Sequence, residues 1–125
     1  MITIEFRGKC IETNEWLCGD LVHDTEGGCY VYPIDCGGLW KNNKVYPETV
    51  GQFTGMCDQH GGKIYEGDIV QYMSLKLIVA WDEKTCAFVM ENNDLSIPLI
   101  NERIHVISVI GDIHDTPGVY PGVIR

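Results

Sequence analysis

The chain has few basic side chains. Its 125 residues include 9 Lys and Arg against 18 Asp and Glu, which gives a net charge of -9. Non-specific binding to a phosphate backbone needs clustered Lys and Arg, so we expect no direct binding of DNA or RNA. The basic residues that exist, such as Arg7, Lys9, Lys41 and Lys44, are spread out rather than gathered in a stripe. With so few and scattered basic residues, the only anion-binding site that we consider is a local basic pocket for a small anion.

Long apolar runs are also missing. No uncharged apolar segment approaches the length that spans a membrane. The first five residues, Met1 to Glu5, lack the basic segment and apolar core of a signal peptide. We therefore expect a soluble, cytoplasmic protein that does not contact membranes. The six cysteines are irregularly spaced, and a cytoplasmic setting is expected to keep them as thiols.

The usual signatures of catalysis are absent as well. The sequence has no phosphate-binding loop and no Gly-x-Ser-x-Gly nucleophile turn. It has no Cys-x-x-Cys pair either; Cys57 and His60 alone have a spacing that zinc can use. We therefore expect no catalytic residue, no cofactor and no metal. The alternative is a thiol- or metal-dependent hydrolase of a nucleotide, built on Cys57, Asp58 and His60.

What the sequence does contain is a period of two. Short apolar-alternating segments are separated by turns rich in Gly, Asn and Asp, and no window predicts an amphipathic helix. This pattern predicts a mainly β fold, a compact antiparallel barrel or sandwich. The run from Gly67 to Phe88 resembles an SH3-like small barrel in the C-terminal half. Arg103 to Ile113 is predicted as the final strand, with a bulge at Val106 and Ile107.

An internal repeat organises these strands. One copy runs from Phe6 to Val22, the other from Phe53 to Val70, and both contain Phe-x-Gly-x-Cys, a polar turn and Gly-Asp before two aliphatic residues. We interpret the repeat as a duplicated hairpin in which glycine meets a sharp turn and aspartate accepts a backbone hydrogen bond. Catalysis by the pair Asp20 and Asp68 is the less favoured interpretation, because active-site carboxylates usually occupy unlike environments.

Aromatic residues crowd the N-terminal half beside Gly-rich loops. Such rings can stack on a base while a nearby cation meets a phosphate. Trp16 is expected instead to fill the core. The candidate ligand-binding residues are Arg7, Tyr30, Tyr32, Trp40, Lys41 and Lys44.

A longer motif resembles a known family. The segment from Pro47 to Val70 follows the pattern P-x-T-V-G-Q-F-T-G-x-x-D-x-x-G-x-x-I-Y-E-G-D-I-V, and it is similar to the hallmark of the YopX family of phage and prophage proteins. Phe6 to Lys9 and Val109 to His114 fit as well, although family members usually carry Asn where this chain has Asp112. The resemblance implies a mostly β protein of bacterial viruses without a generally established activity, and it transfers no catalytic residues.

Taken together, these observations predict a single domain. It is expected to have an N-terminal lobe over about 1–46, a C-terminal lobe over about 47–115 and a tail over 116–125. The expected function is a non-catalytic, homo-oligomeric binding module in the host bacterial cytoplasm. It would act in counter-defence by capturing a nucleotide-type immune signal. An acidic adaptor or inhibitor that binds a host protein is the alternative.

Overall fold

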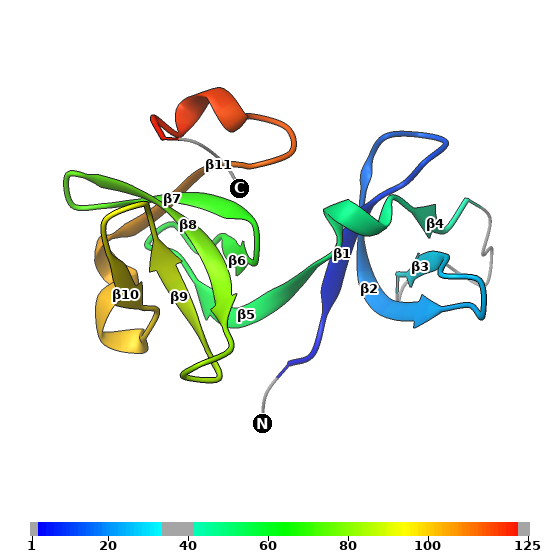
Figure 1. The fold of residues 1–125 in the computed structure, drawn as a ribbon, viewed down its shortest axis with the longest axis horizontal. Coiled ribbons are helices and arrows are strands. Elements are labelled where there is room, and N and C mark those ends of the chain that lie inside the picture. Colours follow the sequence, from blue (N-terminus) through cyan, green and yellow to red (C-terminus); the bar gives the residue numbers. More distant parts are fainter. Residues whose placement is uncertain (1–2, 34–41, 123–125) are drawn as a thin grey trace. The chain divides into compact units, whose positions relative to one another are not determined.

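The computed structural model describes residues 3–33 and 42–122 of the chain (Figure 1). The chain divides between Phe53 and Thr54 into two compact units, which we call the first and the second unit. The strands are β1 (Phe6–Lys9), β2 (Trp16–His23), β3 (Cys29–Tyr32), β4 (Lys44–Val45), β5 (Gly51–Cys57), β6 (Lys63–Tyr65), β7 (Asp68–Tyr72), β8 (Leu75–Asp82), β9 (Ala87–Glu91), β10 (Ser96–Pro98) and β11 (Ile107–Asp112). Short 3-10 helices are η1 (Pro47–Thr49), η2 (Asn101–Val106) and η3 (Pro117–Val119).

The prediction of a mainly β, antiparallel fold is confirmed. Within the described residues the strands form a sheet in the order β4-β3-β2-β1-β5-β6 and a sheet in the order β10-β9-β8-β7-β11. β5 passes from the first unit into the second, so its two ends have different neighbours. Neither sheet closes into a barrel, which favours the sandwich-like alternative.

In the first unit, the sheet curls around a small core. β2 pairs through its first half with β1 and through its second half with β3. A bridge between Cys10 and Val45 brings β4 back to the end of β1. The side chains enclosed in this way are Cys29, Val31 and Val45, with Leu17, Leu21 and Val50 packed against them.

The second unit has the strand order expected of an SH3-like half. Figure 1 shows β7, β8, β9 and β10 as a meander, after which η2 leads into β11. β11 then returns antiparallel to β7. The core contains the buried residues Ile64, Val70, Leu77, Val79, Met90, Leu99 and Ile107.

The edges of this second sheet are protected from pairing with other chains. At one edge, Pro98 ends the short strand β10 and supplies no backbone N–H. At the other edge, the backbone N–H of Gln59 donates to the carbonyl of Ile107, and the carboxylate of Asp58 accepts from the N–H of Val109. The turn before β6 therefore covers the outer edge of β11.

The final strand differs from its prediction. Residues 101–106 form η2, so β11 begins at Ile107 rather than at Arg103. The irregularity lies between Val109 and Gly111 and not at Val106–Ile107. The N–H of Arg103 donates a hydrogen bond to the carbonyl of Ile100 within this helical turn. Such short-range backbone bonds leave no mark in the alternation of apolar and polar side chains, so the sequence pattern did not predict the turn.

The expected tail starts with an ordered segment. After β11, the hydroxyl of Thr116 accepts a hydrogen bond from the N–H of Asp112, and η3 follows. Tyr120 is buried. In the described part of the chain, no helix has the length and apolar character needed to cross a membrane.

Candidate functional site

The outer side of the first sheet gathers aromatic and basic side chains. Side chains of a strand alternate between faces, and directly paired residues share a face. Tyr30 pairs with Val22 and with Lys44, and Tyr32 pairs with Asp20. The same face continues along β2 to Trp16, which pairs with Lys9. We call this surface the aromatic face, and it comprises Arg7, Lys9, Trp16, Tyr30, Tyr32 and Lys44.

Two cations lie over one indole ring of this face. The guanidinium carbon of Arg7 is 4.5 Å from the centroid of Trp16, and the ammonium of Lys9 is 5.5 Å from it. Both distances are within the range of cation–π attraction. Arg7 itself is buried, so its charge is held in place against the ring, whereas Trp16 and Lys9 are half-buried.

A polar cluster occupies the other end of the face. The carboxylate of Asp24 accepts hydrogen bonds from the N–H groups of Gly28 and Glu26, and these bonds hold the pKa of Asp24 below its ordinary value. The Tyr30 hydroxyl donates to the same carboxylate at 3.1 Å, which raises the pKa of Tyr30. Lys44 is exposed on the neighbouring strand, and its charge also favours the ionised form of Asp24. The hydroxyl of Tyr30 is thereby held by Asp24, and its partner across the strands, Lys44, is exposed.

The predicted site residues are thus partly brought together. Arg7, Tyr30, Tyr32 and Lys44 share the aromatic face, while Trp40 and Lys41 lie outside the described residues. Sequence reasoning missed Lys9 and assigned Trp16 to the core. The sequence did contain a signal for both residues. Lys9 is two residues from Arg7, which is the period of a strand, and Lys9 and Trp16 flank the same polar turn.

Within the cluster around Cys57, the carboxylate of Asp58 is engaged by backbone N–H groups. Burial is the largest single influence on the pKa of the Asp58 carboxyl, and by itself it would raise that pKa. Hydrogen bonds from the N–H groups of Val109, Gly62 and His60 outweigh it and leave the pKa below its ordinary value. His60 is exposed, and Cys57 is half-buried. Over residues 3–33 and 42–122, no group of three or more Cys, His, Asp and Glu side chains is placed to hold a metal ion.

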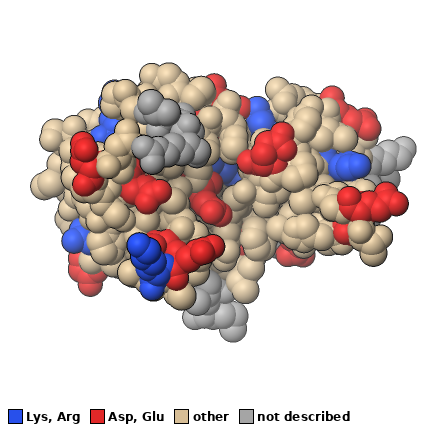
Figure 2. Space-filling view, viewed as in Figure 1, with Lys and Arg blue, Asp and Glu red and all other residues tan. Residues whose placement is uncertain are grey.

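Several other acidic side chains also support turns. The carboxylates of Asp24, Asp58, Asp82 and Asp112 each accept a backbone N–H two residues further along the chain. Such bonds are typical of Asp in turns. On the face drawn in Figure 2, acidic side chains are spread over the surface with few basic ones between them. Part of the negative charge is therefore explained by turn formation.

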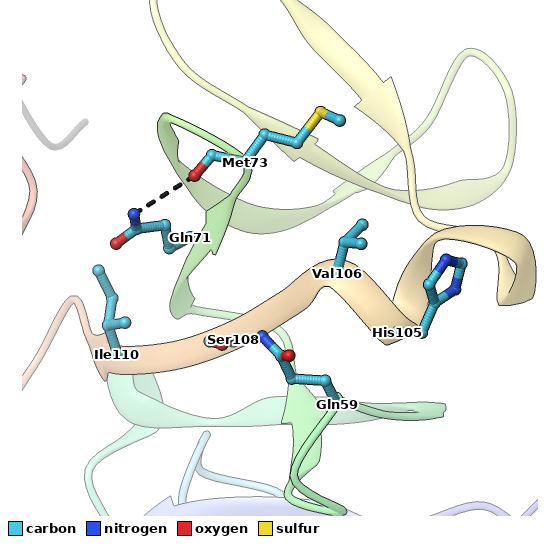
Figure 3. A pocket seen from close by; sticks show the side chains of 7 residues that line it. All are labelled: Gln59, Gln71, Met73, His105, Val106, Ser108 and Ile110. Carbon is cyan, nitrogen blue, oxygen red and sulfur yellow. Dashed lines mark hydrogen bonds between the residues drawn. The ribbon is translucent and has the colours of Figure 1, made fainter.

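The second unit carries a surface pocket of about 490 Å³. Figure 3 shows its side chains gathered along β11 and the turn after β7. The lining residues are Gln59, Gln71, Met73, His105, Val106, Ser108 and Ile110. None of them was predicted as a site residue from the sequence, because they come from three distant stretches of the chain, at 59, 71–73 and 105–110, and form no motif.

Comparisons with known proteins agree with this architecture. The crystal structure of protein EF1440 from Enterococcus faecalis is similar to the chain, with a TM-score of 0.62 and 21% identity over 95% of this chain and 99% of that one. At this identity the likeness shows the fold. No curated protein matches the sequence. The model of the YopX protein family matches residues 5–119, nearly the whole chain. The resemblance seen in the central motif is thereby confirmed, and the chain belongs to the YopX family.

Proposed function

We propose that this YopX-family chain is a non-catalytic binding protein that captures a small nucleotide-type ligand on its aromatic face. The observation that supports the proposal best is the stacking of Arg7 and Lys9 on Trp16 beside the strand pair that carries Tyr30 and Lys44. Aromatic rings offer a sequence-tolerant platform for a base. Lysine and arginine supply the charge that a phosphate requires.

The site acts in a homo-oligomer under this proposal. The first unit exposes several large apolar side chains, namely Ile4, Ile11, Val22 and Tyr46. Val22 lies on the aromatic face itself, in register with Tyr30. A second copy that covers these side chains would remove apolar area from water and would enclose the bound ligand between the two copies. In a phage or prophage setting, such capture serves counter-defence by sequestering a nucleotide-type signal in the host cytoplasm.

Binding without catalysis is consistent with the chemistry of the described acids. Asp58 accepts three backbone N–H groups, so its carboxylate is engaged in the fold rather than aimed at a substrate. A hydrolase built on Cys57, Asp58 and His60 would need this carboxylate to leave its turn. We therefore rank the thiol- or metal-dependent hydrolase below the binding protein.

An acidic adaptor or inhibitor of a host protein is the second candidate. It is favoured by the net charge of -9 and by the spread of acidic side chains in Figure 2. A protein that normally binds nucleic acid is the natural partner of such a surface. This candidate predicts a protein partner and no affinity for nucleotides.

Light scattering coupled to size exclusion, followed by calorimetry, tests the proposal. We expect an oligomer that binds at least one member of a panel of cyclic nucleotides, cyclic dinucleotides and ADP-ribose derivatives, and that returns it intact. Lys44→Glu should weaken this binding about tenfold or more, because it replaces attraction for phosphate with repulsion. The matched control is Lys84→Glu, an exposed lysine in the turn between β8 and β9 of the second unit. A monomer that binds none of the nucleotides would refute the proposal.

A further inference from the structure

The pocket on the second unit has the volume of a small-ligand site. Its volume of about 490 Å³ lies within the range of roughly 300–1,000 Å³ typical of ligand pockets. In Figure 3 the lining comes from β7, the turn after it, η2, β11 and the turn before β6. All of these segments belong to the second unit, so the pocket is complete within that unit.

The lining is partly polar, but it contains no carboxylate, ammonium or guanidinium group. Its polar groups are the amides of Gln59 and Gln71, the hydroxyl of Ser108 and the imidazole of His105. Asp, Glu, Lys and Arg are absent from the residues that line it. A phosphate or carboxylate would find no guanidinium or ammonium there, and the net charge of the chain would oppose it. An uncharged ligand fits this lining better.

The hydrogen bonds within the pocket orient its two amides. The amide nitrogen of Gln59 donates to the hydroxyl of Ser108, and the amide nitrogen of Gln71 donates to the backbone carbonyl of Met73. Each amide then presents its oxygen as an acceptor and retains a second N–H as a donor. Amides held in this way can read the edge of a flat ring that carries both donors and acceptors.

Met73 is an unusual residue for its position. It stands in the two-residue turn between β7 and β8 with a φ of 57°, a region that favours Gly and Asn. Its side chain is 70% exposed, the most exposed of the large apolar residues described. Both features cost the fold free energy. They are explained if the thioether contacts a ligand, and sulfur packs well against aromatic rings.

We propose that this pocket binds an uncharged planar ring with hydrogen-bond donors and acceptors along its edge, the chemistry of a nucleobase. Met73 covers the face of the ring, while Gln59, Gln71 and Ser108 meet its edge. Val106 and Ile110 supply the apolar wall. This site goes beyond the proposed function, because it uses other residues and needs no cation to hold a phosphate. A free nucleoside and the base of a nucleotide are both sources of such a ring.

Calorimetry and ligand-observed NMR on the full chain test the site. The probes are adenosine, guanosine, cytidine and uridine, each compared with its 5′-monophosphate. We expect at least one nucleoside to bind as well as its monophosphate or better. Absence of binding by all four nucleosides, or binding of the monophosphates alone, would overturn the proposal. In the second case the phosphate, and not the ring, would be the group recognised.

Substitutions then locate the binding. Met73→Asn should weaken the nucleoside about twofold to tenfold, the range of a lost sulfur–ring contact. Its unfolding temperature should be no lower than that of the parent, because Asn suits the turn. Leu95→Asn is the matched control, since it replaces another exposed apolar side chain outside the pocket and should leave affinity unchanged. Unchanged affinity in Met73→Asn would refute the assignment.

A second variant keeps the two sites distinguishable. Lys44→Glu is directed at the aromatic face of the first unit, so nucleoside binding that survives this substitution belongs to the pocket. Loss of nucleoside binding in Lys44→Glu with retention in Met73→Asn would place the ring on the aromatic face and overturn the pocket proposal. Failure of the nucleotide panel alone would instead count against the proposed function.

Discussion

The two copies of the repeat use the same residues for different purposes. In the first unit, Gly19 and Asp20 lie inside the continuous strand β2, and Asp20 is exposed. In the second unit, Gly67 separates β6 from β7 with a φ of 93°, and Asp68 is only 2% exposed. The carboxylate of Asp68 accepts a hydrogen bond from the N–H of Tyr65 at 2.7 Å. The predicted corner therefore exists in the second copy, whereas the first copy runs straight through it.

The glycines of the two copies are required for different reasons. Gly67 adopts a left-handed conformation that side chains rarely tolerate. Gly19 instead allows the end of β3 to approach, because a Cβ there would lie 2.2 Å from the carbonyl oxygen of Tyr32. The comparison shows that a repeated Gly-Asp step is not evidence of a repeated turn. One copy uses glycine for its backbone angle, and the other uses it for space.

The largest effect that tests this comparison is expected for Gly19→Ala. The added methyl group meets backbone atoms of Tyr32 and Pro33, which cannot move aside without separating β2 from β3. We expect a loss of about 3 kcal/mol or more in the free energy of unfolding, measured by urea denaturation. Gly27→Ala is the control, since a Cβ at Gly27 contacts nothing within 4 Å. It should cost about 1 kcal/mol through its positive φ alone. Equal losses in the two variants would contradict a role for space at Gly19.

A smaller effect separates the two aspartates. Asp68→Ala leaves the buried N–H of Tyr65 without the acceptor that it has in the native protein, so we expect a loss of about 2 kcal/mol. Asp20→Ala changes an exposed side chain and should stay within about 0.5 kcal/mol of the parent. Thermal and urea unfolding of both variants measure the difference. If Asp20→Ala proved as costly as Asp68→Ala, the two copies would be equivalent after all.

Much of the fold could be predicted from the sequence, because strands with one buried face have a period of two. The alternation of the sequence marks Trp16 to His23 and Cys29 to Tyr32 as strands, and these are the bounds of β2 and β3. Prediction failed where local backbone hydrogen bonds decide the structure, as in η2. The alternation is also misleading at Ile4, which continues the pattern of Phe6 and would belong to the same strand. Ile4 is 67% exposed, because β1 starts only at Phe6.

The candidate sites were less accessible to sequence reasoning. Arg7, Tyr30, Tyr32 and Lys44 were chosen for their chemistry, and the pairing of strands was needed to place them on one face. The pocket of the second unit depends on tertiary proximity of distant segments, and its polar groups are ordinary glutamines and a serine. Among the lining residues, only Met73 is of an unusual type for its position, because methionine is atypical in a two-residue hairpin turn.

The smallest predicted effect compares two turns with the same hydrogen bonds. Asp24 in the first unit and Asp58 in the second each accept the N–H groups two and four residues further on. Asp58 also accepts the N–H of Val109 in β11, whereas the second oxygen of Asp24 accepts an exposed tyrosine hydroxyl. Asp58→Asn should therefore cost about 1 kcal/mol at neutral pH and more than Asp24→Asn. Circular dichroism melts of both variants give this ranking.

The pH dependence of these variants identifies the source of the effect. The pKa of Asp58 lies below its ordinary value of 3.8 in the folded chain, so the ionised carboxylate stabilises the fold at pH values above 3.8. That contribution declines as the pH falls below 3.8 and is lost once the pH passes the folded-state pKa. The difference in melting temperature between the parent and Asp58→Asn should therefore narrow as the pH falls below 3.8. A difference that stays constant over this range would show that the shape of the side chain, and not its charge, secures β11.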